Sequence, residues 1–209
     1  MVEKDAIRRG YDEVAEAFAA RRSFDDEERE IFEEFLDSLV PGSSVLDAGC
    51  GQGTPILRAL AERTSESPPI GLDVSAVQLD LASERVPEAT LIQGDFTHLP
   101  LPESSVDGLV AFHSLIHVPA DQHRRAIEEF ARVVRPGGRV LLSEGTEPWR
   151  GKNPDWLETG TEMQWHIAGA RTTREQIRDA GLAIENEWAT GDVLVEGESW
   201  TFFEAVLPE

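Results

Sequence analysis

The sequence predicts an α/β fold built on a mostly parallel β-sheet with helices on both faces. Short apolar runs alternate with helix-like segments from residue 44 to residue 145, and those segments are long enough for the crossovers that parallel strands require. At the end of the chain, two strand-like runs are separated by a turn-rich segment too short for a helix. The length of 209 residues suits one domain, so we expect a single unit over residues 1–209.

Two amphipathic helices are expected before the first strand, within residues 1–40. The first spans residues 3–20, where four residues share one helical face: Ile7, Tyr11, Val14 and Phe18. The second spans residues 27–39 and ends at Pro41-Gly42.

The central part of the chain, residues 44–145, should supply the parallel strands. We expect them at residues 44–49, 70–74, 89–95, 106–112 and 138–145, with helices from Pro55, from Ala76 and from Asp121 to Val134. Residues 146–171 interrupt the alternation as an insertion. Residues 172–209 should hold a last helix and then two runs, 182–190 and 199–207, that pair as an antiparallel hairpin at the sheet edge.

The chain is strongly acidic, with 40 Asp and Glu, 19 Lys and Arg, and a formal net charge of -21. Its only lysines are Lys4 and Lys152. A halophilic origin is our hypothesis, because molar salt screens the repulsion between such charges; an ordinary acidic protein is the alternative. Since nucleic-acid binding needs a positive surface, we expect no nucleic-acid partner.

The composition also points away from membranes and secretion. No run of about 18 apolar residues could span a bilayer, and the first ten residues contain no apolar signal core. The single cysteine, Cys50, cannot form an internal disulfide or a Cys-rich zinc site. We therefore expect a cytoplasmic protein without a structural metal, and the sequence gives no sign of the oligomeric state.

A glycine-rich loop, Asp47-Ala48-Gly49-Cys50-Gly51-Gln52-Gly53, joins the first strand to the next helix. Glycines permit positive φ and let a ligand approach bare backbone, which favours a nucleoside cofactor. The dinucleotide fingerprint has its last glycine at the sixth position, whereas here it stands at the fifth. The carboxylate of Asp47 would repel a pyrophosphate but suits the ammonium group of S-adenosylmethionine. A tight turn without a ligand is the alternative.

Two more acidic residues follow strand ends. Asp73 closes the second strand, where a carboxylate can accept both ribose hydroxyls of an adenosine. Asp95 closes the third strand, beside Phe96, and could accept the adenine amino group while Phe96 covers the ring. One such residue alone is usually a solvated loop residue. Three at successive strand ends favour a binding site, because open α/β sheets bind ligands at that edge.

Four segments together resemble a known family. VLDAGCGQG, GLDVS, QGDFTHLPLPESSVDGLVAFHSLIHV and VVRPGGRVLLSEG are similar to the successive motifs of class I S-adenosylmethionine-dependent methyltransferases, particularly those acting on small molecules. The opening YDEVAEAFAARR also resembles the N-terminal helix of such enzymes. The resemblance implies a Rossmann-like sheet of seven strands with an antiparallel last strand, an N-terminal helical lid, and methyl transfer by in-line displacement.

The resemblance also assigns cofactor-binding positions. Those implied here are Tyr11, Arg21 or Arg22, Asp47, Ala48, Gly49, Gly51, Gly53, Asp73, Val74, Asp95, Phe96, Ala111 and Phe112. One departure is His113, because the family often has Asn or a small polar residue there.

Histidines are the candidate catalytic residues. A base is optional in methyl transfer, but a phenol, thiol or ammonium acceptor must lose a proton, and histidine is suited to removing it near neutral pH. His113 and His117 follow the fourth strand at the rim of the expected cleft. Packing is the alternative role for His117, and no third ligand supports a metal site with the pair. His98 and His123 are expected at the surface.

The insertion at residues 146–171 is rich in aromatic residues, with Trp149, Trp156 and Trp165. In the resembled family such insertions and the N-terminal helices commonly form a lid over the methyl acceptor. We therefore predict an aromatic acceptor pocket with Trp165 and His166 facing the ligand, and with His166 as a third candidate catalytic residue. Packing of the tryptophans onto the sheet is the alternative.

The function predicted from the sequence is S-adenosylmethionine-dependent transfer of a methyl group to a small-molecule acceptor. A nicotinamide-dependent oxidoreductase is disfavoured by the glycine spacing and by Asp47. Two alternatives stay open: a non-catalytic module that binds S-adenosylmethionine or S-adenosylhomocysteine, and a methyltransferase that acts on proteins.

Overall fold

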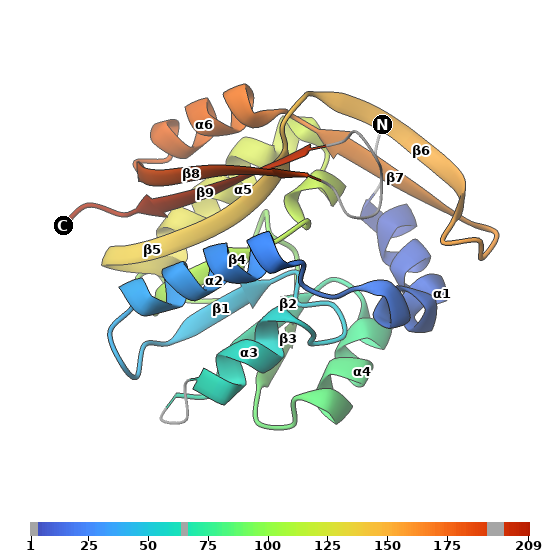
Figure 1. Cartoon of the computed structure of the whole chain (residues 1–209), viewed down its shortest axis with the longest axis horizontal. Helices are drawn as coiled ribbons and strands as arrows, with labels where there is room; N and C mark the ends of the chain where they lie inside the picture. The colour runs from blue at the N-terminus through green and yellow to red at the C-terminus, as the bar shows by residue number, and fades with distance from the viewer. Residues whose placement is uncertain (1–3, 64–66, 192–198) are drawn as a thin grey trace.

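The computed structural model describes residues 4–63, 67–191 and 199–209 and shows a seven-stranded sheet in the order β3-β2-β1-β4-β5-β9-β8 (Figure 1). The strands are β1 (Val45–Ala48), β2 (Ile70–Asp73), β3 (Thr90–Gln93), β4 (Val106–Ala111), β5 (Val134–Gly145), β8 (Ala183–Gly191) and β9 (Ser199–Val206). β1 to β5 pair in parallel, and β9 is antiparallel to both β5 and β8. The predicted fold class is therefore confirmed, while the predicted turn at residues 192–198 lies outside the described residues.

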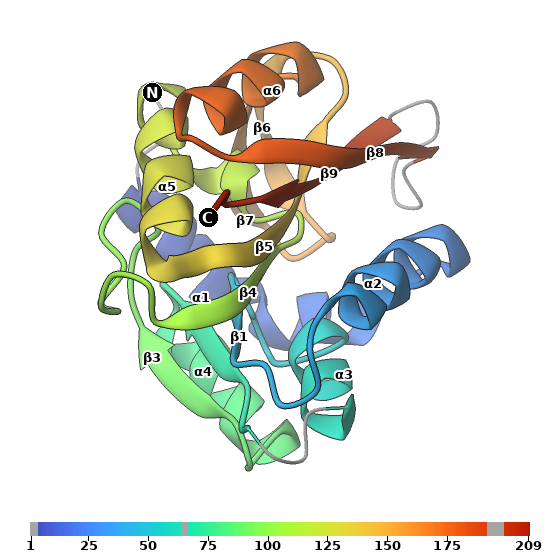
Figure 2. The ribbon, with the colours of Figure 1, turned by 90° about the vertical axis from the view of Figure 1, so that its left-hand side faces the viewer.

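Helices cover both faces of the sheet. They are α1 (Lys4–Arg21), α2 (Asp26–Ser38), α3 (Ile56–Arg63), α4 (Ala76–Arg85), α5 (Ala120–Val133) and α6 (Ala170–Asp179), with a short 3-10 turn η1 (Leu115–His117). Figure 2 shows α5 and α6 on one side of the sheet and α2 and α3 on the other, where two separate apolar clusters form. All four residues of β1 are buried, as expected for a central parallel strand covered on both faces. None of the described helices is long and apolar enough to cross a bilayer.

The insertion after β5 forms a separate hairpin of β6 (Trp149–Trp156) and β7 (Thr161–Ile167), paired in antiparallel fashion. The hairpin lies beside α1 (Figure 1). Ile7 and Val14 of α1 pack against Met163 of β7 in a small apolar cluster. α1 and the hairpin therefore form one layer next to the carboxyl ends of the parallel strands, where the predicted site residues lie.

Candidate active site

A cleft opens where the loops after β1, β2, β3 and β4 meet α1. Nine of the predicted cofactor residues line it: Tyr11, Asp47, Gly49, Gly51, Asp73, Val74, Asp95, Phe96 and Phe112. The sheet order explains this convergence, because the strands are parallel and their carboxyl ends share one edge.

The glycine loop approaches its neighbours too closely for a side chain. Gly49 has a φ of +87°, and a Cβ placed there would lie 2.5 Å from the Cβ of Ser114. The backbone N–H groups of Gly49 and Cys50 both donate to the carbonyl of Leu72, at 2.7 and 3.0 Å, which holds the loop against β2. Gly51 also has a positive φ, of +52°. At Gly49 and Gly51 the loop therefore presents bare backbone to the cleft.

Asp47 carries a carboxylate oxygen without a partner. Its side chain is buried, and its Oδ2 makes no hydrogen bond to any described residue. Burial, and next the charge of Asp73, raise the pKa of Asp47 to about 8. An unpartnered buried carboxyl is costly, and a cationic group bound in the cleft would satisfy it. The residues present therefore fit the ammonium group of S-adenosylmethionine.

Asp73 is oriented by the backbone. Its Oδ2 accepts from the N–H of Gly51 at 3.0 Å and its Oδ1 from the N–H of Ser75 at 2.9 Å. Burial raises the pKa of Asp73 to about 6, although these hydrogen bonds act in the opposite direction. Carboxylate oxygens have further lone pairs, so the group can still accept ribose hydroxyls.

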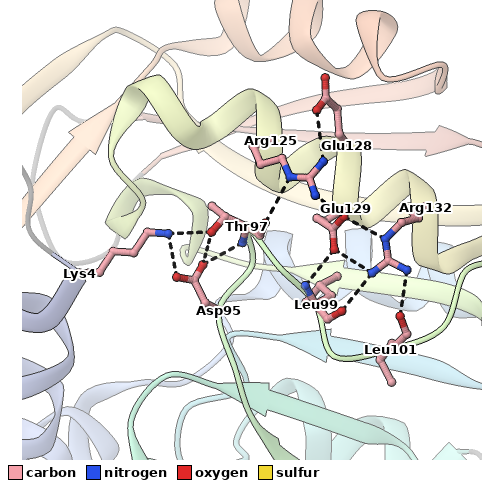
Figure 3. Close-up of polar contacts among 9 residues, drawn as sticks. All are labelled: Lys4, Asp95, Thr97, Leu99, Leu101, Arg125, Glu128, Glu129 and Arg132. Atoms are coloured by element: carbon pink, nitrogen blue, oxygen red, sulfur yellow. Dashed lines mark hydrogen bonds and ion pairs between the residues drawn. The ribbon is translucent and has the colours of Figure 1, made fainter.

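Asp95 is held by the N-terminal helix and by its own loop (Figure 3). Its carboxylate accepts from the Nζ of Lys4 at 2.7 Å and from the backbone and hydroxyl of Thr97, both at 2.8 Å. Burial acts to raise the pKa of Asp95, but the bonds from Lys4 and Thr97 lower it overall. The loop is fixed from α5, where Glu129 accepts from the N–H of Leu99 at 2.9 Å. α1 thus covers the part of the cleft where the sequence analysis placed the adenine ring.

Four predicted cofactor residues do not line the cleft. Arg21 is exposed and pairs with Glu158 on the hairpin at 3.6 Å, whereas its neighbour Arg22 lines the cleft. Ala48 and Ala111 are fully buried inside their strands. Gly53 packs against α4 and its end, because a Cβ there would meet Val86 and Ala82 at 3.1 and 3.3 Å. Gly53, Ala48 and Ala111 therefore belong to the loop and the sheet behind the cleft, and Arg21 points to the hairpin.

A second cavity of about 400 Å³ adjoins the cleft. Five of the described residues line both, and they form the wall between them: Tyr11, Phe18, Arg22, His113 and His117. Four of the five tryptophans line the second cavity: Trp149, Trp156, Trp165 and Trp200. The predicted aromatic pocket is thus present next to the cofactor cleft, and Trp200 of β9 is a member that the sequence did not indicate.

His113 is held by a buried carboxylate. Its Nε2 bonds to the Oε1 of Glu28 on α2, and its backbone N–H donates to the Oγ of Ser143 at 2.8 Å. Arg22 lies 3.4 Å from the other oxygen of Glu28. Burial acts to raise the pKa of Glu28, but His113 and then Arg22 lower it overall, so the carboxylate is ionised.

Glu28 is a residue that the sequence analysis missed. It is 3% exposed, and on α2 it shares the buried face with Phe32 and Phe35. An acidic residue at that helical spacing within an apolar face was the available signal.

His117 and Tyr11 form a second pair across the same wall. The hydroxyl of Tyr11 lies 2.7 Å from the Nε2 of His117, and the Nδ1 of His117 lies 3.2 Å from the carbonyl of Gln164. A carbonyl only accepts, so Nδ1 carries the proton and Nε2 accepts from Tyr11. Burial lowers the pKa of His117 to about 4, which keeps the ring neutral and makes it a weak base. The hydrogen bonds favour the structural role considered for His117.

His166 and His123 differ from the predictions. His166 does not line the second cavity, and its Nδ1 accepts from the N–H of Ala120 at 3.2 Å. Neighbouring residues on a strand point to opposite sides, so Trp165 and His166 do not both face the cavity. His123 is fully buried and not at the surface, with its Nε2 2.8 Å from the carbonyl of Val118. Within the described ranges, no group of three or more His, Cys, Asp or Glu could hold a metal ion.

Comparisons with known proteins agree with this geometry. Residues 45–138 match a family model described as a methyltransferase domain. The malonyl-[acyl-carrier protein] O-methyltransferase of Yersinia pestis is 34% identical over 144 residues, which are 68% of this chain and 51% of that protein. The tRNA (carboxymethyluridine(34)-5-O)-methyltransferase of Arabidopsis thaliana is 30% identical over 180 residues, which are 84% of this chain and 40% of that protein. The chain thus spans about half or less of these relatives.

Among solved structures, the [4+2]-cyclase SpnF superposes with a TM-score of 0.77 at 20% identity, covering 98% of this chain and 97% of that one. This likeness shows that the chain has the same fold as SpnF. Together, the matched segment, the named relatives and the sheet order show that the chain belongs to the class I S-adenosylmethionine-dependent methyltransferase family.

Proposed function

We propose that the protein transfers the methyl group of S-adenosylmethionine to a small-molecule acceptor bound in the tryptophan-lined cavity. One observation carries the proposal: the unpartnered carboxyl oxygen of Asp47 lies in a cleft that shares a wall with a second cavity lined by tryptophans. A cationic cofactor in the first space and an acceptor in the second would meet at that wall.

Different residues of the cleft would bind different parts of the cofactor. Asp47 would hold the ammonium group, Asp73 the ribose, and Phe96 with Asp95 the adenine end. The cofactor supplies a methyl group activated on a sulfonium. Transfer needs the acceptor atom about 3 to 3.5 Å from that carbon and in line with it, so positioning and exclusion of water provide much of the rate. His113, with Glu28 behind it, is placed to take a proton from the acceptor.

The relatives support this class without fixing the acceptor. One acts on an acyl-carrier protein substrate and another on tRNA, according to their names. A net charge of -21 disfavours a nucleic-acid acceptor for this chain, because phosphates would be repelled. A protein acceptor and a non-catalytic binding module are the remaining alternatives. A cytoplasmic location and a halophilic origin also remain our proposals.

Calorimetry tests the cofactor assignment. We expect the protein to bind S-adenosylhomocysteine and not nicotinamide dinucleotide. Asp47→Ala and Asp73→Ala should each weaken binding by about tenfold or more, since each removes a buried charge-assisted contact. Asp80→Ala is the matched control, because Asp80 is an exposed aspartate on α4. Unchanged affinity in both site variants would refute the proposal, and absence of turnover against a broad acceptor set in high salt would favour the binding module.

A further inference from the structure

Flat aromatic side chains form a large part of the wall of the second cavity. The rings of Trp156 and Trp165 meet edge to face with their centroids 4.8 Å apart, and Trp200 meets the imidazole of His113 in the same way at 4.3 Å. These rings come from β6, β7 and β9, so strands that are distant in the sequence surround one space. Aromatic walls favour a ligand that offers a planar ring for stacked or edge contacts.

The charged side chains that line this cavity, counted over the described residues, balance. Arg22 and Lys152 contribute two positive charges, and Asp25 and Glu28 contribute two negative ones. Glu28 already contacts His113 and Arg22, so its charge is compensated within the protein. Among the described residues that line the cavity, we therefore find no excess charge that would select a cationic or an anionic acceptor.

Its polar end is the pair of His113 and Glu28. His113 lines both the cavity and the cofactor cleft, and it is the only histidine of the shared wall whose ring contacts a carboxylate in the described part of the chain. A histidine backed by a carboxylate can accept a proton because the carboxylate stabilises the imidazolium that forms.

We infer that the acceptor is a planar aromatic compound with an ionisable hydroxyl group, a phenol or naphthol, seated between the tryptophans with its hydroxyl directed at His113. This inference rests on the proposed function and narrows it. The hydroxyl proton passes to the imidazole of His113. A lone pair of the oxygen forms the new C–O bond as the C–S bond of the cofactor breaks, which leaves an aryl methyl ether and S-adenosylhomocysteine. Glu28 is a positioning residue that orients His113 and stabilises its charged form.

A matched set of ligands tests the class without turnover. The probes are 2-naphthol, 2-naphthoate, 2-naphthylmethylammonium and the saturated alcohol decalin-2-ol, titrated into protein loaded with S-adenosylhomocysteine and followed by tryptophan fluorescence and calorimetry. We expect 2-naphthol to bind at least about tenfold more tightly than the other three. Tighter binding of either charged probe, or equal binding of decalin-2-ol, would overturn the inference. Failure of S-adenosylhomocysteine to bind at all would instead overturn the proposed function.

Two substitutions locate the site. Trp165→Ala should weaken 2-naphthol binding by about tenfold or more while leaving S-adenosylhomocysteine affinity within about twofold. Trp188→Ala is the matched control, because Trp188 packs partly buried on β8 and does not line the cavity. Equal effects of the two variants on 2-naphthol would mean that Trp165 acts only through packing, and would refute the placement.

Glu28→Gln tests the positioning role with a change of charge at constant size. With 2-naphthol as acceptor, kcat should fall by about tenfold or more, while KM and the affinity for 2-naphthol change by less than about twofold. A parallel loss of kcat and of 2-naphthol affinity would show that Glu28 merely holds the cavity together, and would refute this role.

Discussion

The binding of S-adenosylhomocysteine should depend on pH through Asp47. Burial raises the pKa of this carboxyl to about 8, so in the empty cleft it is mostly protonated at neutral pH. The ammonium group of the ligand pairs with the ionised form, so binding must release the proton, and lower pH opposes binding. With a pKa of about 8, the ionised fraction rises from about 9% at pH 7 to half at pH 8, and affinity should rise about fivefold.

Two other titratable groups that line the cleft, Asp73 and His117, do not mimic this change. Burial raises the pKa of Asp73 only to about 6, so Asp73 is about nine-tenths ionised at pH 7. Burial lowers the pKa of His117 to about 4, so it stays neutral throughout. We therefore expect the rise between pH 7 and 8 to come from Asp47, and the Asp47→Asn variant tests this assignment.

The assay is titration calorimetry at pH 7, 7.5 and 8 in buffers of different ionisation enthalpy, which also counts released protons. At pH 7 we expect about 0.9 proton released per ligand bound. Asp47→Asn should bind weakly and with no pH dependence over this range, whereas Asp80→Asn should follow the unmodified protein. A flat affinity profile with no proton release in the unmodified protein would refute the reasoning, since Asp47 would then be ionised before the ligand arrives.

Three further predictions follow from the site and the composition. Arg22→Ala should weaken S-adenosylhomocysteine binding, because Arg22 lies at the wall of the cleft, while Arg21→Ala should change it by less than about twofold; equal losses would refute the assignment. Gly49→Ala should lower the melting temperature and abolish cofactor binding, because its Cβ would overlap that of Ser114. The control is Gly181→Ala, because Gly181 has a similar φ of +88° but no atom near the place of a Cβ. This control should lose only about 1–2 kcal/mol of stability through backbone strain, and it should bind the cofactor normally. The melting temperature should fall as KCl is diluted from about 2 M to about 0.1 M, and a salt-independent melt would contradict the halophilic hypothesis.

The parallel core could be predicted because burial on both faces leaves a direct trace in the sequence. β1 reads as a continuous apolar run around Asp47, and all of its residues are buried. The β6–β7 hairpin left no such trace. Residues 149–156 read WRGKNPDW, which has neither an apolar alternation nor a hydrophobic run that would mark a strand. In the structure all eight of these residues are exposed or half-buried.

The cofactor cleft could be predicted for a related reason. Its residues directly follow strands that the sequence already located. Because the ends of parallel strands lie at one edge of the sheet, locating the strands also located these residues. Arg21 and Arg22 could not be distinguished in this way, because α1 ends at Arg21 and helical spacing no longer applies to the next residue. The pair of Glu28 and His113 spans 85 residues, and only the packing of α2 against the end of β4 brings them together.

Both lysines of this acidic chain lie next to the two proposed ligand-binding spaces. In a chain whose positive charge is almost entirely arginine, Lys4 lines the cofactor cleft and Lys152 lines the tryptophan-lined cavity. The ammonium of Lys4 donates to both Asp95 and Thr97 at 2.7 Å, and that of Lys152 lies 2.6 Å from Glu162 across the β6–β7 hairpin. A compact ammonium can serve two acceptors at one point, whereas a guanidinium is a broad planar fork. The two-acceptor geometry applies to Lys4, which fixes α1 to the loop after β3, while Lys152 joins the two strands of the hairpin beside the second cavity.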